Sequence, residues 1–246
     1  MSEYNPFPSK DSIETFLIRH FTSTKETNIH VDPRMRYKFG YGADLEKVYL
    51  TDKVKIIGIM FCHPGSAIAS KDILPRLEYL HYRSGEYTDL FWAGYGPFMH
   101  GRTPPPAFPV KIVGDTEWAF SDEAFNAMRV EIEANTTWKY SGETDLLLTT
   151  ARLNPETHKA YLDFSETLVC DLDKMLQQGA ITSVARFLEE LFRFGENSST
   201  KDVFDYSDFK FLDSSKRTLW RWLLDRLKVR GYFERTEPFA IRDISK

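Results

Sequence analysis

Cys62 and His63 stand side by side in a loop, CHPGS, that directly follows the most apolar stretch of the chain. Residues 53–61 of that stretch are nearly all apolar, which is typical of a strand buried on both faces. Open α/β sheets bind ligands beyond the carboxyl ends of such strands. A thiol whose pKa is lowered by an imidazolium or a helix N-terminus is a nucleophile, so Cys62 and His63 are the candidate catalytic residues. Two alternatives are an inert buried cysteine and an anion site at Gly65 and Ser66.

Asp145 and Asp163 are a second candidate set, because they lie on two strand-like segments, TDLLLTTARL and KAYLDF, joined by a turn. Two carboxylates can hold Mg²⁺ for hydrolysis, so both residues are candidate metal ligands. A helix with Glu131 and Glu133 precedes this predicted hairpin, and the layout resembles the restriction-endonuclease-like nuclease core. Ser165 stands where that family carries its lysine. The resemblance implies a metal-dependent nuclease, and the alternative is a pair of solvent-facing carboxylates on a half-buried hairpin.

The carboxyl-terminal region is basic, although the whole chain carries a net charge of −4. Residues 214–235 hold seven basic and two acidic side chains, a net charge of +5, which leaves −9 for the rest. Basic side chains along a helix can meet the phosphates of a nucleic acid. The candidate nucleic-acid-binding residues are Lys216, Arg217, Arg221, Arg226 and Arg235. The alternative is that these charges solvate a helix that buries Trp220 and Trp222, or that they dock a protein.

The spacing of apolar residues predicts the elements that position these side chains. Helices are expected at residues 10–22, 71–85 and 121–134, and strands at 53–61, 87–95, 110–114, 144–153 and 159–164. Ser9 or Asp11 and Ser121 are expected N-caps, whereas five prolines within residues 96–109 indicate a rigid loop. The strand, helix and strand of residues 53–95 form a βαβ unit with parallel strands. The predicted fold class is α/β, with a mixed sheet that contains a βαβ unit and a β-hairpin.

The order of these elements resembles the thioredoxin-like fold over residues 53–178. The segment FCHPGS falls where that family carries its redox cysteines, so the resemblance places Cys62 at the redox position. Gly65 occupies the place of the second cysteine, and no proline precedes the TDLLL strand where the family has its cis-proline.

The last part of the chain resembles a winged-helix domain, on the segments TSVARFLEELFRF, YSDFKFL and SSKRTLWRWLLDRLKVRGYFERTEPFAIRDI. These correspond to a first helix, a short second helix, and a third helix that ends in a glycine before a hairpin wing. In that family the third helix enters the major groove of DNA, and many members bind proteins instead. Two domains are therefore predicted, an α/β domain with an N-terminal helix at residues 1–178 and a winged-helix-like module at 182–246.

Composition excludes several classes of protein. With 42% hydrophobic and 15% aromatic residues among 246, the chain can bury a core and is not of the disordered class. No apolar run approaches the ~20 residues of a membrane span, and no secretory signal is visible. Two cysteines cannot form a disulfide framework, and the six histidines lack metal-ligand spacing. We therefore expect a cytoplasmic protein with no cofactor and no membrane contact.

The first hypothesis for function is an adaptor or accessory subunit without catalytic activity. It would bind a protein partner, and nucleic acid through the winged-helix-like module. The alternative is an enzyme, either a thiol enzyme that uses Cys62 and His63 or a degenerate nuclease that uses Asp145 and Asp163. The missing second cysteine and the missing lysine favour the binding hypothesis, while the partner and the oligomeric state stay open.

Overall fold

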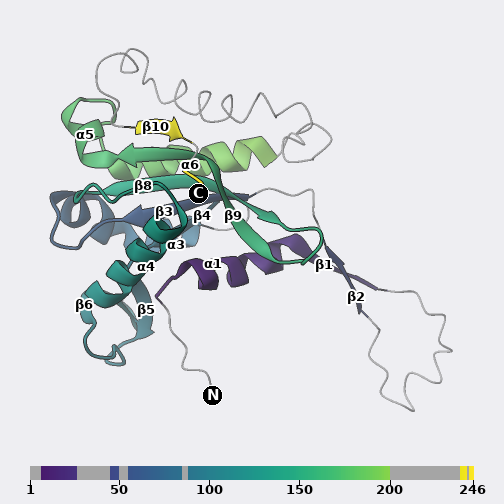
Figure 1. The fold of residues 1–246 in the computed structure, drawn as a ribbon. Helices are drawn as coiled ribbons and strands as arrows, with labels where there is room; N and C mark the ends of the chain where they lie inside the picture. Colours follow the sequence, from purple (N-terminus) through teal and green to yellow (C-terminus); the bar gives the residue numbers. More distant parts are fainter. Residues whose placement is uncertain (1–6, 27–44, 50–54, 85–87, 200–238, 243) are drawn as a thin grey trace.

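The computed structural model describes residues 7–26, 45–49, 55–84, 88–199, 239–242 and 244–246 (Figure 1). Its main element is a mixed five-stranded sheet of order β10-β9-β8-β3-β4, which agrees with the predicted α/β class. The strands are β3 (Lys55–Phe61), β4 (Thr88–Trp92), β8 (Asp145–Leu153), β9 (Ala160–Asp171) and β10 (Phe239–Arg242). β3 and β4 are parallel, and the other neighbouring pairs are antiparallel. The predicted βαβ unit and hairpin are therefore both present.

β3 lies inside the sheet, between β8 and the edge strand β4, and all seven of its residues are buried. Its apolar run fits this place because both faces of the sheet are covered. A side chain at Gly58 would force Leu90 to shift, because a Cβ at this position would lie 2.7 Å from Leu90 Cδ1 on the neighbouring strand. The strand thus fixes where the loop that begins at Cys62 leaves the sheet.

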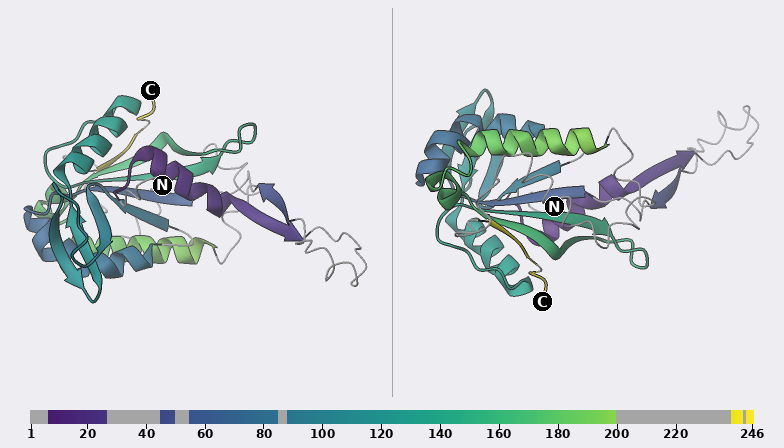
Figure 2. Two further views of the ribbon diagram at one scale, coloured as in Figure 1. Left: turned by 90° about the horizontal axis from the view of Figure 1, so that it is seen from below. Right: turned by 90° about the horizontal axis from the view of Figure 1, so that it is seen from above.

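Helices cover both faces of this sheet (Figure 2). α1 (Lys10–Leu17), its 3-10 extension η1 (Ile18–Phe21) and α4 (Asp122–Asn135) lie on one face. α3 (Leu77–Arg83) and α6 (Val184–Ser199) lie on the other, and α5 (Leu172–Gln177) follows β9. Ser9 caps α1 by accepting from Ser12 N, and Ser121 caps α4 by accepting from Ala124 N, as the sequence predicts.

The helix predicted at residues 71–85 is broken into three pieces. A π-helical turn, η2 (Ala69–Ile73), and a 3-10 turn, η3 (Leu74–Arg76), precede the α-helical α3. Pro75 explains the break, because it lacks an amide donor and its ring clashes with the preceding turn.

A three-stranded antiparallel sheet is inserted between β4 and α4. It consists of β5 (Tyr95–Met99), β6 (Phe108–Val113) and β7 (Thr116–Phe120) in the order β5-β7-β6. The prediction of a loop over residues 96–109 is therefore wrong at both ends, and β7 was not predicted. Prolines usually indicate a loop, but Pro97 and Pro109 lie on the two outer strands β5 and β6. A missing amide donor is tolerated at the edge of a sheet.

The N-terminal part of the chain also forms a two-stranded arm. β1 (Thr22–Glu26) pairs with β2 (Leu45–Tyr49) in antiparallel register, from Thr22 opposite Tyr49 to Glu26 opposite Leu45. The arm projects away from the body at the end of α1 and η1 (Figures 1 and 2).

Residues on both sides of the boundary predicted between residues 178 and 182 contribute to one hydrophobic core. α6, expected as the first helix of a separate module, buries Phe187 and Leu191 in the core that it shares with the sheet. Val184 N, at the start of α6, donates to Asp72 Oδ2 at 2.8 Å. β10, expected in the wing, pairs with β9 instead. The described parts of 182–246 thus pack on the α/β sheet, and residues 200–238, which carry most of the predicted winged-helix-like module, lie outside the described residues.

Candidate functional site

The loop after β3 is held by hydrogen bonds around a buried thiol. Cys62 is fully buried, and its Sγ lies 3.5 Å from Ser66 Oγ. Thr144 Oγ1, just before β8, donates to the same Sγ at 3.8 Å. Tyr95 Oη donates to the Cys62 carbonyl at 2.9 Å. Residues from three separate segments thus converge on Cys62.

This environment opposes formation of a thiolate. Burial raises the pKa of the Cys62 thiol, and hydrogen bonds from Ser66 and Thr144 only partly counter it. The negative charge of Asp173 raises this pKa further. A nucleophilic cysteine requires a lowered pKa and access to substrate. The arrangement therefore favours the alternative of an inert buried cysteine.

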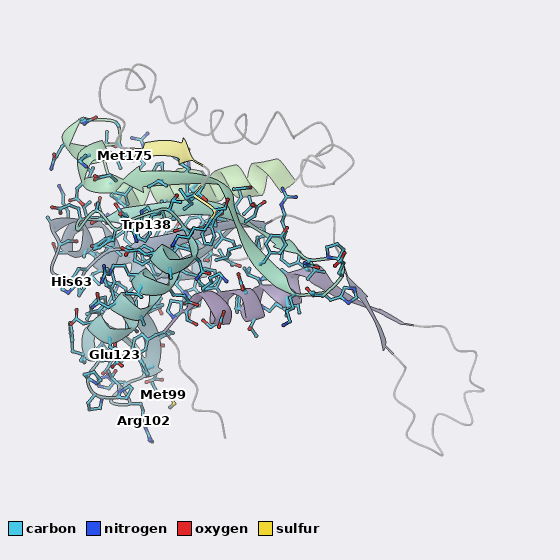
Figure 3. The ribbon with its side chains drawn as sticks, in the orientation of Figure 1. His63, Met99, Arg102, Glu123, Trp138 and Met175 are labelled. Carbon is cyan, nitrogen blue, oxygen red and sulfur yellow. The ribbon has the colours of Figure 1, made fainter. Side chains whose placement is uncertain are left out.

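His63 does not activate its neighbour. Its ring nitrogens are already engaged, since Nδ1 accepts from Gly65 N at 3.2 Å and Nε2 lies 3.1 Å from Asp122 Oδ1. The half-exposed ring packs edge-on against Phe120, with ring centroids 5.1 Å apart. Figure 3 shows His63 at the margin of the molecule. His63 thus joins the loop to the start of α4, and both of its ring nitrogens are bonded to groups other than the Cys62 thiol.

Asp145 lies at the same edge of the sheet, at the start of β8. Its carboxylate accepts from Ser141 N at 2.9 Å and from Ser141 Oγ at 2.8 Å. Burial raises the pKa of Asp145, and the facing carboxylate of Asp171, its partner in the β8–β9 register, adds to this rise. Burial also raises the pKa of Tyr140 to about 12, with Asp145 as the next cause.

Asp163 is placed elsewhere. It stands opposite Thr150 on the hairpin, five residues along β8 from Asp145. At about 3.3 Å per residue the two carboxylates are roughly 17 Å apart, which is too far for a shared ion. Asp163 instead pairs with Arg152 Nε at 3.1 Å and accepts from Ser165 Oγ at 2.6 Å. The structure therefore does not bring the predicted metal ligands together.

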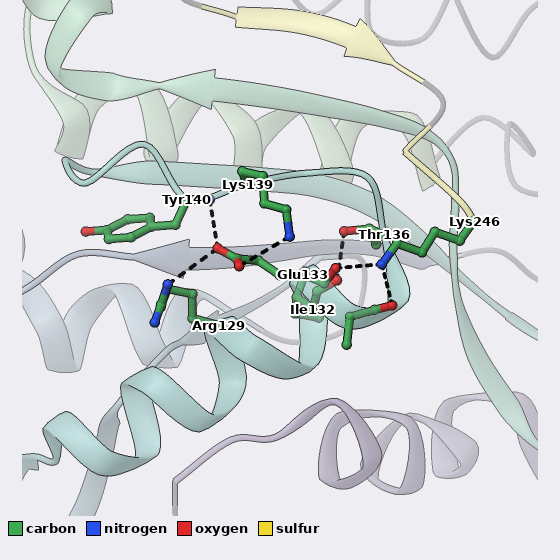
Figure 4. A network of polar contacts seen from close by, with 8 residues as sticks. Arg129, Ile132, Glu133, Thr136, Lys139, Tyr140 and Lys246 are labelled. Atoms are coloured by element: carbon green, nitrogen blue, oxygen red, sulfur yellow. Dashed lines mark hydrogen bonds and ion pairs between the residues drawn. The ribbon is translucent and has the colours of Figure 1, made fainter.

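Thr144 and Ser141 reach this edge because a network around Glu133 holds the loop before β8 (Figure 4). The Glu133 carboxylate pairs with Arg129 and Lys139 and accepts from Tyr140 N at 3.1 Å. Burial raises the pKa of Glu133, but the hydrogen bond from Tyr140 and the two cations outweigh it and lower the pKa overall.

The C-terminal residues close the other side of this network. Lys246 Nζ donates to the Glu133 and Ala134 carbonyls at 3.0 and 2.7 Å, at the carboxyl end of α4 (Figure 4). A cation there complements the helix dipole, and α4 itself has no basic residue in its last turn.

Sequence reasoning missed Thr144, Tyr95 and Asp122, which contact Cys62 or His63 from distant segments. Only the position of Thr144 just before a predicted strand could have pointed to the carboxyl edge of the sheet. Met99 and Arg102, which belong to the predicted proline-rich loop, lie at the far end of the three-stranded sheet and not near Cys62 (Figure 3). The basic residues predicted to bind nucleic acid lie outside the described residues.

A second candidate surface joins α3 and α6, and we call it the tyrosine–arginine face. It consists of Tyr79, Tyr82 and Arg83 on α3 and of Glu189 and Arg193 on α6. Tyr79 and Tyr82 are 51% and 74% exposed. Glu189 accepts from Tyr79 Oη at 2.8 Å and pairs with Arg83 and Arg193 at 3.4 and 3.3 Å. The network thus holds Tyr79, Arg83 and Arg193 in place at the surface, and Tyr82 lies one turn of α3 from Tyr79.

Among the described residues, no group of three or more His, Cys, Asp or Glu side chains could hold a metal ion. In the same part of the chain, no helix is both long and apolar enough to cross a membrane. No family model, curated protein or solved structure matches the chain.

Proposed function

We propose that the protein is an adaptor or accessory subunit that binds a protein partner and catalyses no reaction. The observation that carries the proposal is the tyrosine–arginine face. Tyrosine and arginine are the side chains that dominate binding energy at protein interfaces, and exposed copies held by a network lose little entropy on binding. Tyr82 is the most exposed of the large apolar residues in the described chain.

The state of the loop after β3 supports a binding function over an enzyme. The thioredoxin-like resemblance is part of this proposal, and the parallel pair of β3 and β4 beside the antiparallel β8 and β9 supports it. Within such an arrangement, Cys62 would occupy the redox position, yet its thiol is buried and its pKa is raised. A protein whose Cys62 thiol is buried can still bind a partner through exposed surfaces such as the tyrosine–arginine face.

The experiment uses the full chain as bait in its native cells, followed by cross-linking and mass spectrometry. We expect a protein partner whose cross-links map to α3 and α6. With the recombinant partner, Tyr82→Ala should weaken the affinity roughly 30-fold, the size of a ~2 kcal/mol hot spot. Tyr161→Ala, which removes another exposed tyrosine, is the matched control and should leave the affinity unchanged. Equal binding by the Tyr82 variant and the wild type would rule out this face.

Nucleic-acid binding by the winged-helix-like segment belongs to the same proposal. The +5 charge of residues 214–235 supports it. If three to five of these charges meet phosphates, log K should fall against log salt with a slope of roughly −3 to −5. Replacing Lys216, Arg217 and Arg221 together by Ala should reduce that slope by up to about three. Absence of DNA and RNA binding even at ~20 mM salt would leave a protein as the partner.

A further inference from the structure

α6 carries a stripe of charged side chains on the side that faces away from the core. Its apolar residues, such as Phe187 and Leu191, are buried against the sheet. Arg186, Glu190 and Arg193 are spaced by four and three residues, so they share the opposite side of the helix. Figure 2 shows α6 at the outside of the molecule, next to α3. The stripe is therefore open to a neighbouring molecule.

Glu190 and Arg193 carry charges of opposite sign that bind each other only loosely. Their side chains are 43% and 59% exposed, and Glu190 Oε1 lies 3.9 Å from Arg193 Nη1. This distance is too long for a hydrogen bond. A carboxylate and a guanidinium each offer several hydrogen-bonding sites, so both groups can also bind a charge on another molecule. This part of α6 thus offers an acceptor group and a donor group side by side.

α3 adds an exposed aromatic side chain to the same part of the surface. Tyr79 Oη donates to the Glu189 carboxylate of α6 at 2.8 Å. The Arg83 guanidinium lies 5.8 Å from the centre of the Phe192 ring, also on α6. Tyr82 comes between Tyr79 and Arg83 on α3, which places it beside the same part of α6. A tyrosine at the centre of a protein contact often dominates the binding energy.

We infer that the protein bound at the tyrosine–arginine face is a second copy of this chain, with the two α6 helices antiparallel across a two-fold axis. The axis passes between Glu190 and Arg193, so that Glu190 of each copy lies beside Arg193 of the other. The surface is then complementary in charge to itself, which a surface with charges of a single sign cannot be. The Tyr82 side chains of both copies lie near the same axis. The inference rests on the proposed function, because it names the partner for the surface proposed there.

Self-association of the wild-type chain is the first measurement. The contact joins short helical segments through few charges, so we expect a weak dimer with a Kd on the order of 10 µM. Sedimentation velocity of the full-length protein between ~1 and ~500 µM covers this range. The dimer should weaken when salt is raised from ~50 to ~500 mM, because ions screen exposed charge pairs.

Two charge reversals test the pairing itself. Arg193→Glu and Glu190→Arg each place like charges at both symmetric contacts, so each variant alone should dimerise at least about 30-fold more weakly than the wild type. In an equal mixture, one variant supplies two cations and the other two carboxylates. Every contact then joins opposite charges, so the mixture should associate within about fivefold of the wild-type affinity. A variant that had merely lost its fold could not be rescued in this way.

Arg186→Glu is the matched control, because it makes the same substitution on the same helix about 8 Å along the axis from the midpoint of the contact. It should change the Kd by no more than about threefold. Circular dichroism checks that each variant is folded. A wild type that stays monomeric at ~500 µM, a dimer that persists in both single variants, or a mixture that does not associate overturns the inference. The proposed function is tested separately, because the cross-linking experiment would then identify a different protein at this face.

Discussion

The two ends of β3 differ in the buried polar groups that surround them. At the carboxyl end, Cys62 is uncharged and lies among hydroxyl groups from Ser66 and Thr144. At the amino end, Lys55 and Asp89 form a buried ion pair in which Nζ lies 2.8 Å from Oδ2. The sequence pointed to the carboxyl end as the reactive one, because it has a cysteine beside a histidine.

The difference shows that reactivity depends on where a side chain points and not on its chain neighbours. Cys62 and His63 leave the end of β3 in opposite directions, so one is buried and the other half-exposed. Lys55 and Asp89 come from two parallel strands and lie on the same face of the sheet, which brings them within 2.8 Å. The buried ion pair therefore lies at the amino end of β3, where the sequence showed no motif.

The largest expected effect is at the amino end of β3. Lys55→Met leaves Asp89 buried without its main counter-charge, which typically costs about 3–5 kcal/mol. The free energy of unfolding, measured in urea at pH 8, should fall by that amount. His20 Nε2 lies 3.6 Å from Asp89 Oδ2, so His20⁺ can replace the lost cation and the loss should be smaller at pH 5.5.

The double variant Lys55→Met/Asp89→Leu is the control. It removes both charges and should recover most of the stability, because a buried ion pair can be replaced by apolar residues at little cost. A loss below about 1 kcal/mol in the single variant would mean that water already screens the pair, and the contrast between the two ends would disappear.

An intermediate effect is expected at the carboxyl end, in the reactivity of Cys62. Alkylation by iodoacetamide at pH 8 should be at least about 100-fold slower in the folded protein than in urea, because the thiol reacts only after local opening. Mass spectrometry of the tryptic peptide measures the rate. Fast labelling of the folded protein, with an apparent pKa below the usual value near 8.5, would restore the thiol-enzyme alternative.

The smallest effect is expected at Asp145, on the same edge. Since the folded pKa of this carboxyl is raised, its stabilisation is present below the ordinary pKa of about 3.9 and is lost as the pH rises through the folded pKa. At pH 7, Asp145→Asn should therefore be neutral or stabilising by up to about 1 kcal/mol, since Asn can still bond to Ser141.

Thermal unfolding with and without Mg²⁺ checks this prediction. The gain should shrink near pH 3.5, and Mg²⁺ should shift wild type and variant equally. A shift by Mg²⁺ in the wild type alone would instead assign Asp145 to a metal site.

The sequence predicted the main sheet well, because its elements are encoded by local patterns. The apolar run of β3, the Ser121 cap of α4, the strand β8 and the first part of β9 each carry a clear periodicity or capping signal, whereas the continuation of β9 from residue 165 to Asp171 was not predicted. Of the three-stranded insertion, the sequence predicted only the part of β6 within residues 110–114, because prolines interrupt both of its outer strands. The packing of α6 on the main sheet was not predicted, because the amphipathic pattern of a helix does not show which core it faces.

By itself, the sequence determined the α/β fold class, the βαβ unit and the residue at which β3 ends, since these depend on side chains close in the chain. Only the tertiary structure decided what those residues can do. Thr144 closes over Cys62 from 82 positions away, and His20 meets Lys55 from 35. Protonation states follow from such distant neighbours and from burial, because both set the energy of a charge relative to water.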